Sequence, residues 1–188
     1  MRDAGLKNAG RRIDCLCLRM MSTVGLCAAI GVSAASASSE TLQGAYTTLG
    51  KKKDWEAIQW SAGSADLCAI RTEVDLAENS ERGEAVAFLT YEPGQDIPVF
   101  SYITGRHIPS GQTGAEIVVD DDELRIELVG YEDAFFVHPS DDKVLYEALK
   151  MGGSARVEAN FSDGVRISDE FSLMGILDST RILERAGC

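Results

Sequence analysis

The chain has 188 residues, with 18 Lys and Arg against 30 Asp and Glu, and a net charge of −12 at pH 7. This charge repels phosphate backbones and anionic lipid headgroups, which argues against a protein that binds nucleic acid or a membrane surface. The length fits one domain behind a short N-terminal segment, and such a domain can bury a sizeable core without metals.

The first 37 residues have the pattern of an export signal. Five basic residues precede or enter an apolar run at 20–32, and Ala35-Ser36-Ala37 then forms a small-x-small cleavage site. The apolar run has about a dozen residues, whereas a membrane-spanning helix needs about 20. We therefore expect cleavage between Ala37 and Ser38, and no stable membrane anchor.

Two details bear on the export route. Arg11-Arg12 would suit a twin-arginine signal, but Asp14 stands where that signal usually has a bulky apolar residue, so the general secretory route is favoured. Cys27 follows Leu26 rather than the small residue that lipid modification requires. Lipidation is therefore not expected.

Cleavage would also decide which cysteines and charges the mature protein keeps. Removing 37 of the 188 residues leaves 151, with 13 Lys and Arg and 28 Asp and Glu. A net charge near −15 favours cationic partners or divalent ions. Cys68 and Cys188 remain, and in an oxidising compartment they have one possible intramolecular pairing. We expect a Cys68–Cys188 disulfide; the alternative is two free thiols.

Residues 38–53 are small and polar and are expected to form a flexible lead-in to one domain at 54–188. From Trp55 onward the pattern favours short strands. They are expected at 55–60, 67–74, 85–91, 98–104, 116–119, 124–129 and 133–138. The spacing of five between Trp55 and Trp60 places these two side chains on opposite faces of a strand.

The period then changes to that of a helix. Ser140 is placed to cap it, and Asp141 and Asp142 suit its positive end. Its expected apolar face consists of Val144, Leu145, Ala148 and Leu149. Gly152-Gly153 would end it.

Two more strands and a closing helix complete the chain. Strands are expected at 155–160 and 165–171, joined by an Asp163-Gly164 turn. The closing helix, at 174–186, would end at Gly187. Its expected buried residues are Ile176, Leu177, Ile182 and Leu183. The whole pattern predicts a mainly β fold, an antiparallel β-sandwich with two short helices near the C-terminus.

Few residues suit catalysis. His107, in a glycine-bearing loop, and His138 are the histidines available for acid–base chemistry near neutral pH. The sequence has no G-x-S-x-G, His-Glu-x-x-His or Cys-x-x-Cys pattern, so neither a catalytic residue, a cofactor nor a transition-metal site is predicted. The acidic run at 120–123 lacks the Gly and distal Glu of a helical calcium loop and is interpreted as a solvated hairpin turn.

Several features in order along the chain resemble the invasion-associated locus B family. They are the export signal, Asp54-Trp55, Cys68, the strand pair around 120–122, Ala148-Leu149-Lys150-x-Gly152, the segment SDEFSLMG at 168–175, and terminal Cys188. In that family a Thr-x-Asp-x-Tyr/Phe-Ser-Leu-x-Gly segment leads into a closing helix that ends at Cys. Members often carry a further cysteine soon after the first-strand Trp, where this chain has Gln59-Trp60-Ser61.

The resemblance implies a small exported protein of alphaproteobacteria, in the periplasm or at the cell surface. Some members are linked to host-cell invasion, and the family has no established enzymatic activity. We therefore expect a non-enzymatic protein that binds a protein or an envelope component. The alternatives are a periplasmic hydrolase that uses His107 with a carboxylate, and a small-ligand-binding domain with a pocket between its sheets.

Overall fold

A computed structural model describes residues 46–62, 65–76, 80–109, 114–121 and 124–188. All of them belong to one unit, Glu40–Cys188. The predicted signal and the cleavage point between Ala37 and Ser38 lie outside the described residues.

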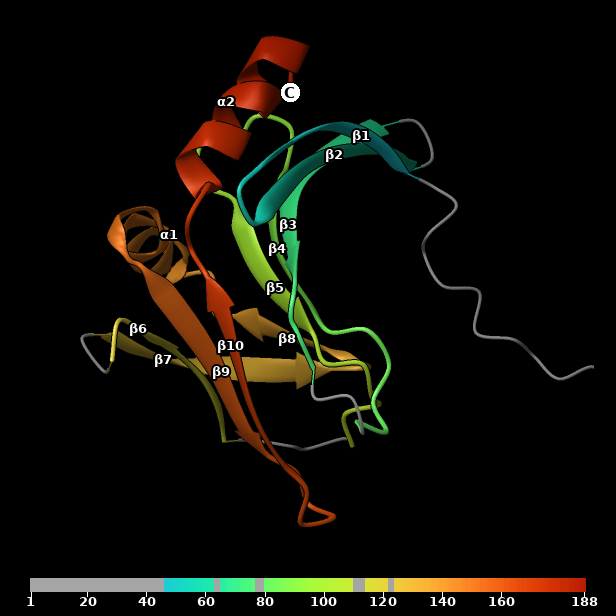
Figure 1. Cartoon of the computed structure of the whole chain (residues 1–188), viewed down its shortest axis with the longest axis vertical. Coiled ribbons are helices and arrows are strands. Elements are labelled where there is room, and N and C mark those ends of the chain that lie inside the picture. The colour runs from blue at the N-terminus through green and yellow to red at the C-terminus, as the bar shows by residue number, and fades with distance from the viewer. Residues whose placement is uncertain (1–45, 63–64, 77–79, 110–113, 122–123) are drawn as a thin grey trace, which may run out of the picture. The chain divides into compact units, whose positions relative to one another are not determined.

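Ten strands and two helices follow one another in the described part of the chain (Figure 1). They are β1 (Tyr46–Lys52), β2 (Trp55–Ala62), β3 (Ala65–Glu73), β4 (Val86–Tyr91), β5 (Val99–Ile103), β6 (Ala115–Val119), β7 (Leu124–Tyr131), β8 (Ala134–Val137), α1 (Asp142–Met151), β9 (Ser154–Asn160), β10 (Arg166–Ser172) and α2 (Ile176–Ala186). The fold is mainly β, with both helices late in the chain, as predicted.

The predicted lead-in at 38–53 is wrong for Tyr46–Lys52, which form β1. This segment lacks the alternation of a half-buried strand, because both of its faces are largely exposed. It is a strand because its main chain pairs with β2, from Tyr46 opposite Trp60 to Lys52 opposite Trp55. The remaining part of the predicted lead-in, 38–45, lies outside the described residues.

The strands form one antiparallel sheet in the order β1-β2-β3-β4-β5-β8-β7-β6-β9-β10. The sheet curls so that its two ends approach each other, as Figure 1 shows for β2 and β10. The indole of Trp55 donates a hydrogen bond to the Ser172 carbonyl at 2.9 Å, and its ring meets that of Phe171 edge-on at 6.4 Å. A single curled sheet thus supplies the two facing layers expected of a sandwich.

The core lies inside this curl and follows the predicted alternation. In β7, Ile126 and Leu128 are buried while Arg125 and Glu127 are exposed. In β2, Trp55 is fully buried and Trp60 is half-buried, which is consistent with opposite faces. Inward-facing residues of strands distant in sequence therefore share one apolar interior.

Helix α1 differs from the prediction at its start. Asp141, not Ser140, occupies the N-cap position, and the Ser140 hydroxyl lies 2.9 Å from His138 Nδ1 instead. The buried face consists of Leu145, Tyr146 and Leu149.

Val144 was predicted on the buried face of α1 but is 54% exposed. Its place is taken by Tyr146, whose hydroxyl lies 3.0 Å from the Tyr91 hydroxyl in β4. Residues two positions apart lie about 200° apart around a helix axis, so a helix that buries Tyr146 leaves Val144 on the solvent side.

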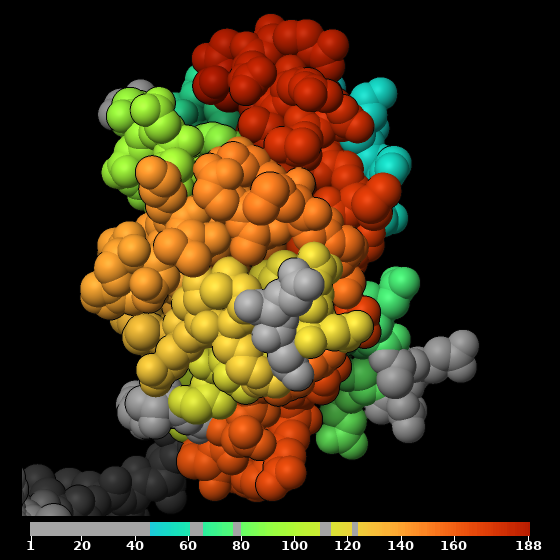
Figure 2. All heavy atoms as spheres, turned by 90° about the vertical axis from the view of Figure 1, so that its left-hand side faces the viewer, coloured from blue at the N-terminus to red at the C-terminus, as the bar shows by residue number. Residues whose placement is uncertain are grey.

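Helix α2 lies next to α1 at one end of the sheet (Figure 2). It begins at Ile176, and Leu177, predicted to be buried, is 46% exposed. Ser179 is buried instead, because its small side chain lets the helix approach β2 and its hydroxyl donates to the Trp55 carbonyl at 2.8 Å. Gly187 caps the helix in the left-handed region, with φ of 85°.

Candidate functional site

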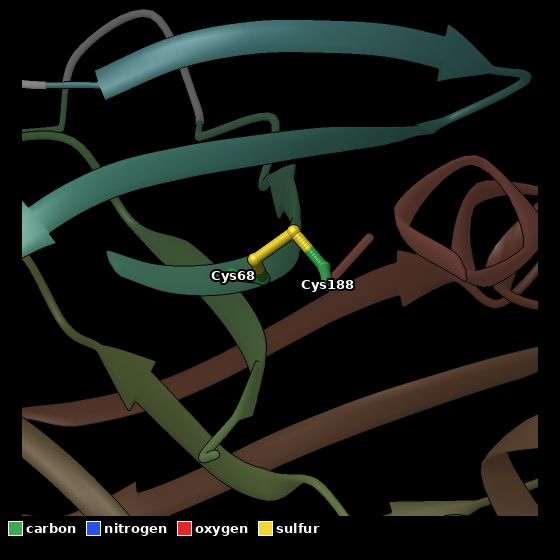
Figure 3. Close-up of a disulfide and its surroundings, with 2 residues drawn as sticks. All are labelled: Cys68 and Cys188. Atoms are coloured by element: carbon green, nitrogen blue, oxygen red, sulfur yellow. A yellow bond between two sulfur atoms is a disulfide. The ribbon is translucent and has the colours of Figure 1, made fainter. Parts of the chain in front are cut away.

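The predicted disulfide is confirmed: Cys68 in β3 is bonded to Cys188, just after α2 (Figure 3). The two Cα atoms are 6.0 Å apart, within the usual range for a disulfide. The bond joins residues separated by 120 positions and fastens the end of the chain to the sheet.

The two histidines are exposed and lie in different places. His107 follows β5 in a loop, and within the described ranges no hydrogen bond or ion pair joins it to a carboxylate. His138 follows β8, and its Nδ1 contacts Ser140. The structure does not bring His107 into a polar cleft with an acidic partner in the part of the chain it describes.

The acidic turn has a structural contact. Asp120 and Asp121 have positive φ values of 45° and 50°, which fit a tight turn between β6 and β7. The Asp120 carboxylate accepts hydrogen bonds from the amides of Gly153 and Ser154 at 2.8 and 3.1 Å. Among the described residues there is no group of three or more His, Cys, Asp or Glu side chains placed to hold a metal.

A hollow of the surface lies beside β10. A groove of about 810 Å³ has residues 165–170 on one side and the segment after β3 on the other. That second side is formed by Asp75, Leu76, Ser80, Glu81 and Arg82. A smaller hollow of about 350 Å³ continues it beside Glu170, Phe171 and Ser172. Together they form what we call the β10 groove.

Strand β10 is the last strand of the sheet, so one side of its main chain has no strand partner in the part of the chain that the structure describes. At the two ends of its pairing with β9, the Phe161 amide donates to the Val165 carbonyl and the Leu173 amide donates to the Gly153 carbonyl. Because bonding direction alternates along an antiparallel strand, odd-numbered residues of β10 bond to β9.

The even-numbered residues Arg166, Ser168 and Glu170 therefore direct their N–H and C=O groups into the β10 groove. Ser172 follows the same rule, since its carbonyl accepts the Trp55 indole N–H. The groove thus presents three consecutive donor–acceptor positions to an incoming chain.

An ion pair lies under this edge. Arg82 donates to both carboxylate oxygens of Asp169, at 2.7 and 2.6 Å, and the Tyr102 hydroxyl donates to the same carboxylate at 2.5 Å. Asp169 is 7% exposed and Tyr102 is fully buried. The hydrogen bond to Asp169 raises the pKa of Arg82, while burial and the same carboxylate raise the pKa of Tyr102.

This network fixes the groove rather than offering a reactive group. The Arg82 charge is neutralised by Asp169, and Arg106 is similarly engaged with Asp163 at 2.5 Å. Among the described residues no ion-pair partner is found for Arg166 or Glu170, which are exposed on the outer face of β10. The arrangement can hold an extended main chain and select it by charge.

Sequence reasoning missed Arg82, Tyr102 and Asp169. One signal was present: Asp169 stands between Ile167 and Phe171 at an inward position of an alternating strand, where a carboxylate needs a buried partner. Nothing local identified that partner, because Arg82 is 87 positions away.

No family model, curated protein or solved structure matches this chain. The resemblance to the invasion-associated locus B family therefore stays a prediction. Neither helix among the described residues has the length and apolar character needed to cross a bilayer.

Proposed function

We propose that the protein is an exported, non-enzymatic binding module of the invasion-associated locus B type, acting in the periplasm or at the cell surface of a Gram-negative bacterium. Its partner is a protein or an envelope component, and a role in host-cell interaction is what the family resemblance adds. The N-terminal pattern and the Cys68–Cys188 disulfide support export to an oxidising compartment.

The observation that carries the binding function is the open edge of β10. Arg166, Ser168 and Glu170 present main-chain donors and acceptors inside a groove. Extended segments of partner proteins add to such edges, where main-chain hydrogen bonds supply affinity and side chains supply specificity. We therefore assign the β10 groove as the binding surface.

Capture from envelope extract tests this assignment, with wild type, Ser168→Pro and Ser168→Ala as bait. Proline at 168 removes an outward N–H but none of the bonds to β9, so the strand should tolerate it. Alanine keeps the main-chain donor and serves as the matched control. Wild type and Ser168→Ala should capture the same species, and Ser168→Pro should lose it with unchanged circular dichroism. Capture by Ser168→Pro equal to wild type would exclude the groove.

His107→Ala separates binding from the hydrolase alternative. A binding module should keep its fold and its captured species, whereas loss of a catalytic base typically lowers a rate by about 10²–10⁴-fold. If His107→Ala abolishes the activity or phenotype of the protein while its melting curve is unchanged, the hydrolase alternative replaces this proposal.

Export is tested by the intact mass of the protein recovered outside the cytoplasm. The expected mature chain begins at Ser38, directly after Ala37. A species that begins at or before Met21 would contradict cleavage at this site.

A further inference from the structure

The two edges of the sheet are protected to different degrees. Strand β1 carries Lys51 and Lys52, has a bulge between Thr48 and Gly50, and is packed by α2. Lysines, bulges and covering helices are the usual means of blocking edge-to-edge pairing. Strand β10 has no lysine and no covering helix, and its register with β9 is continuous from Arg166 to Ser172. The loop residues Asp75, Leu76 and Ser80–Arg82 face it across the β10 groove.

An inward-pointing charge is another protective device, and β10 contains one in Asp169. Here that carboxylate is already held within the same chain by Arg82 and Tyr102. It therefore does not prevent another strand from pairing with this edge.

The exposed charges of β10 are self-complementary. Arg166 and Glu170 lie two residues before and two residues after Ser168, and all three residues are exposed on the same face of the strand. When such a strand pairs antiparallel with a copy of itself about Ser168, Arg166 of each copy faces Glu170 of the other.

The main chain fits the same register. Because Arg166, Ser168 and Glu170 all direct their N–H and C=O groups outward, each of the three facing positions is a hydrogen-bonded pair. About six main-chain hydrogen bonds would join the two strands. Figure 1 shows the turn end of the β9–β10 hairpin extending past β5 and β8.

We propose that β10 pairs with β10 of a second copy, antiparallel about a two-fold axis at Ser168, and that this copy is the occupant of the β10 groove when no other strand is bound. The inference rests on the proposed function, which assigns this edge as the binding surface. The self-complementary charges favour a second copy over an unrelated peptide, since an isologous interface requires each residue to face its own complement.

Sedimentation equilibrium of the exported protein tests the proposal, because an interface of one strand edge is small and its dimer should dissociate on dilution. Wild type should reach a dimer at high concentration. Arg166→Glu and Glu170→Arg each place like charges opposite one another and should weaken dimerisation about tenfold or more. The double variant Arg166→Glu/Glu170→Arg restores opposite charges and should recover the wild-type dimer. Ser168→Pro should be monomeric.

Three results would overturn the proposal: wild type that is monomeric at every soluble concentration, a dimer that persists in Ser168→Pro, or a double variant no better than the single ones. Circular dichroism of each variant distinguishes a misfolded protein from a folded one that has lost pairing. If Ser168→Pro fails to fold, the comparison of Arg166→Glu/Glu170→Arg with the two single variants still tests the proposal. A monomeric wild type whose partner capture is still abolished by Ser168→Pro would refute self-pairing alone. A dimer with the expected charge dependence, but with partner capture unaffected by Ser168→Pro, would refute the proposed function alone.

Discussion

The guanidinium of Arg82 and the carboxylate of Asp169 form two hydrogen bonds, at 2.7 and 2.6 Å, across 87 positions of the chain. Arg82 comes from the segment between β3 and β4, and Asp169 comes from the edge strand β10. The pair therefore ties the two sides of the curled sheet together directly beneath the β10 groove. Its loss should affect both the stability of the fold and the shape of that groove.

Arg82→Met should lower the free energy of unfolding by about 3–5 kcal/mol, because it leaves the Asp169 carboxylate buried without its cation. Arg82→Met/Asp169→Leu should recover part of this loss, since an apolar pair replaces two buried charges. Recovery should be incomplete because the buried Tyr102 hydroxyl loses its acceptor. Urea unfolding of the three proteins measures both effects.

The matched control is Arg181→Met, which breaks the exposed Arg181–Asp178 pair on α2. Such surface pairs are worth about 0–1 kcal/mol, so this variant should unfold nearly as wild type does. Equal losses for Arg82→Met and Arg181→Met would mean that the buried pair does not hold the sheet closed.

The buried tyrosines should make the protein sensitive to alkali. The pKa of Tyr102 is raised by burial and by Asp169, and the pKa of Tyr91 is raised mainly by burial. Above about pH 10 the unfolded chain loses phenolic protons that the folded protein keeps. The free energy of unfolding should therefore fall as pH rises, by at most about 1.4 kcal/mol per pH unit for each tyrosine. Below that pH these groups should contribute no pH dependence.

Urea unfolding between about pH 9 and pH 11 measures this slope. Tyr102→Phe should flatten it, whereas Tyr131→Phe, at a position 67% exposed, should not. The same slope in wild type and in Tyr102→Phe would contradict a protonated, buried phenol at position 102.

Local patterns predicted the β-rich fold, most strand positions and the two helices, because alternation and capping depend on near neighbours. They failed where distant contacts decide. The sequence of β1 resembles that of a polar linker, because this strand is stabilised by pairing with β2 rather than by burial of one face. In α2, apolarity favoured Leu177 for the core, but the position against β2 requires the small, hydrogen-bonding Ser179.

The β10 groove could not be predicted from local sequence patterns, for the same reason. It exists because the curl brings β10 near the segment after β3, and no short window contains both sides. The disulfide could be predicted because the predicted mature chain holds two cysteines, and two cysteines allow one intramolecular pairing.

Gly175→Ala should be strongly destabilising. Gly175 has φ of 112°, and a Cβ there would lie 2.1 Å from the Lys52 carbonyl oxygen. The substitution adds left-handed backbone strain to a collision with main chain, which we expect to cost about 2–5 kcal/mol in total.

Gly164→Ala is the control, because its φ is also positive, at 86°, while no atom lies within 4 Å of the added Cβ. It should cost about 1 kcal/mol from strain alone. Thermal melts of the two variants measure the difference, and similar melting temperatures would mean that the close approach of Lys52 to Gly175 is not maintained in solution.

The last prediction concerns the Cys68–Cys188 bond. Cys188→Ser should lower the free energy of unfolding by about 2–5 kcal/mol, because the open chain regains the entropy of a loop that spans 120 positions. Cys188 is the better position to change, since it is exposed, whereas Cys68 is buried and a serine there would place a hydroxyl in the core.

The effect should also be local. Ile182 of α2 packs over Gly50 of β1, and the disulfide holds the next turn of that helix against β3. In Cys188→Ser the end of α2 should therefore be cleaved faster by a protease that cuts after Arg181 or Arg185, with other sites unchanged. A reductant should bring wild type to the same stability and have no effect on Cys188→Ser. Two free thiols titrated in the native, oxidised protein would contradict the bond itself. If the bond is present but Cys188→Ser is as stable as wild type, packing of Ile176 and Leu183 alone anchors the helix.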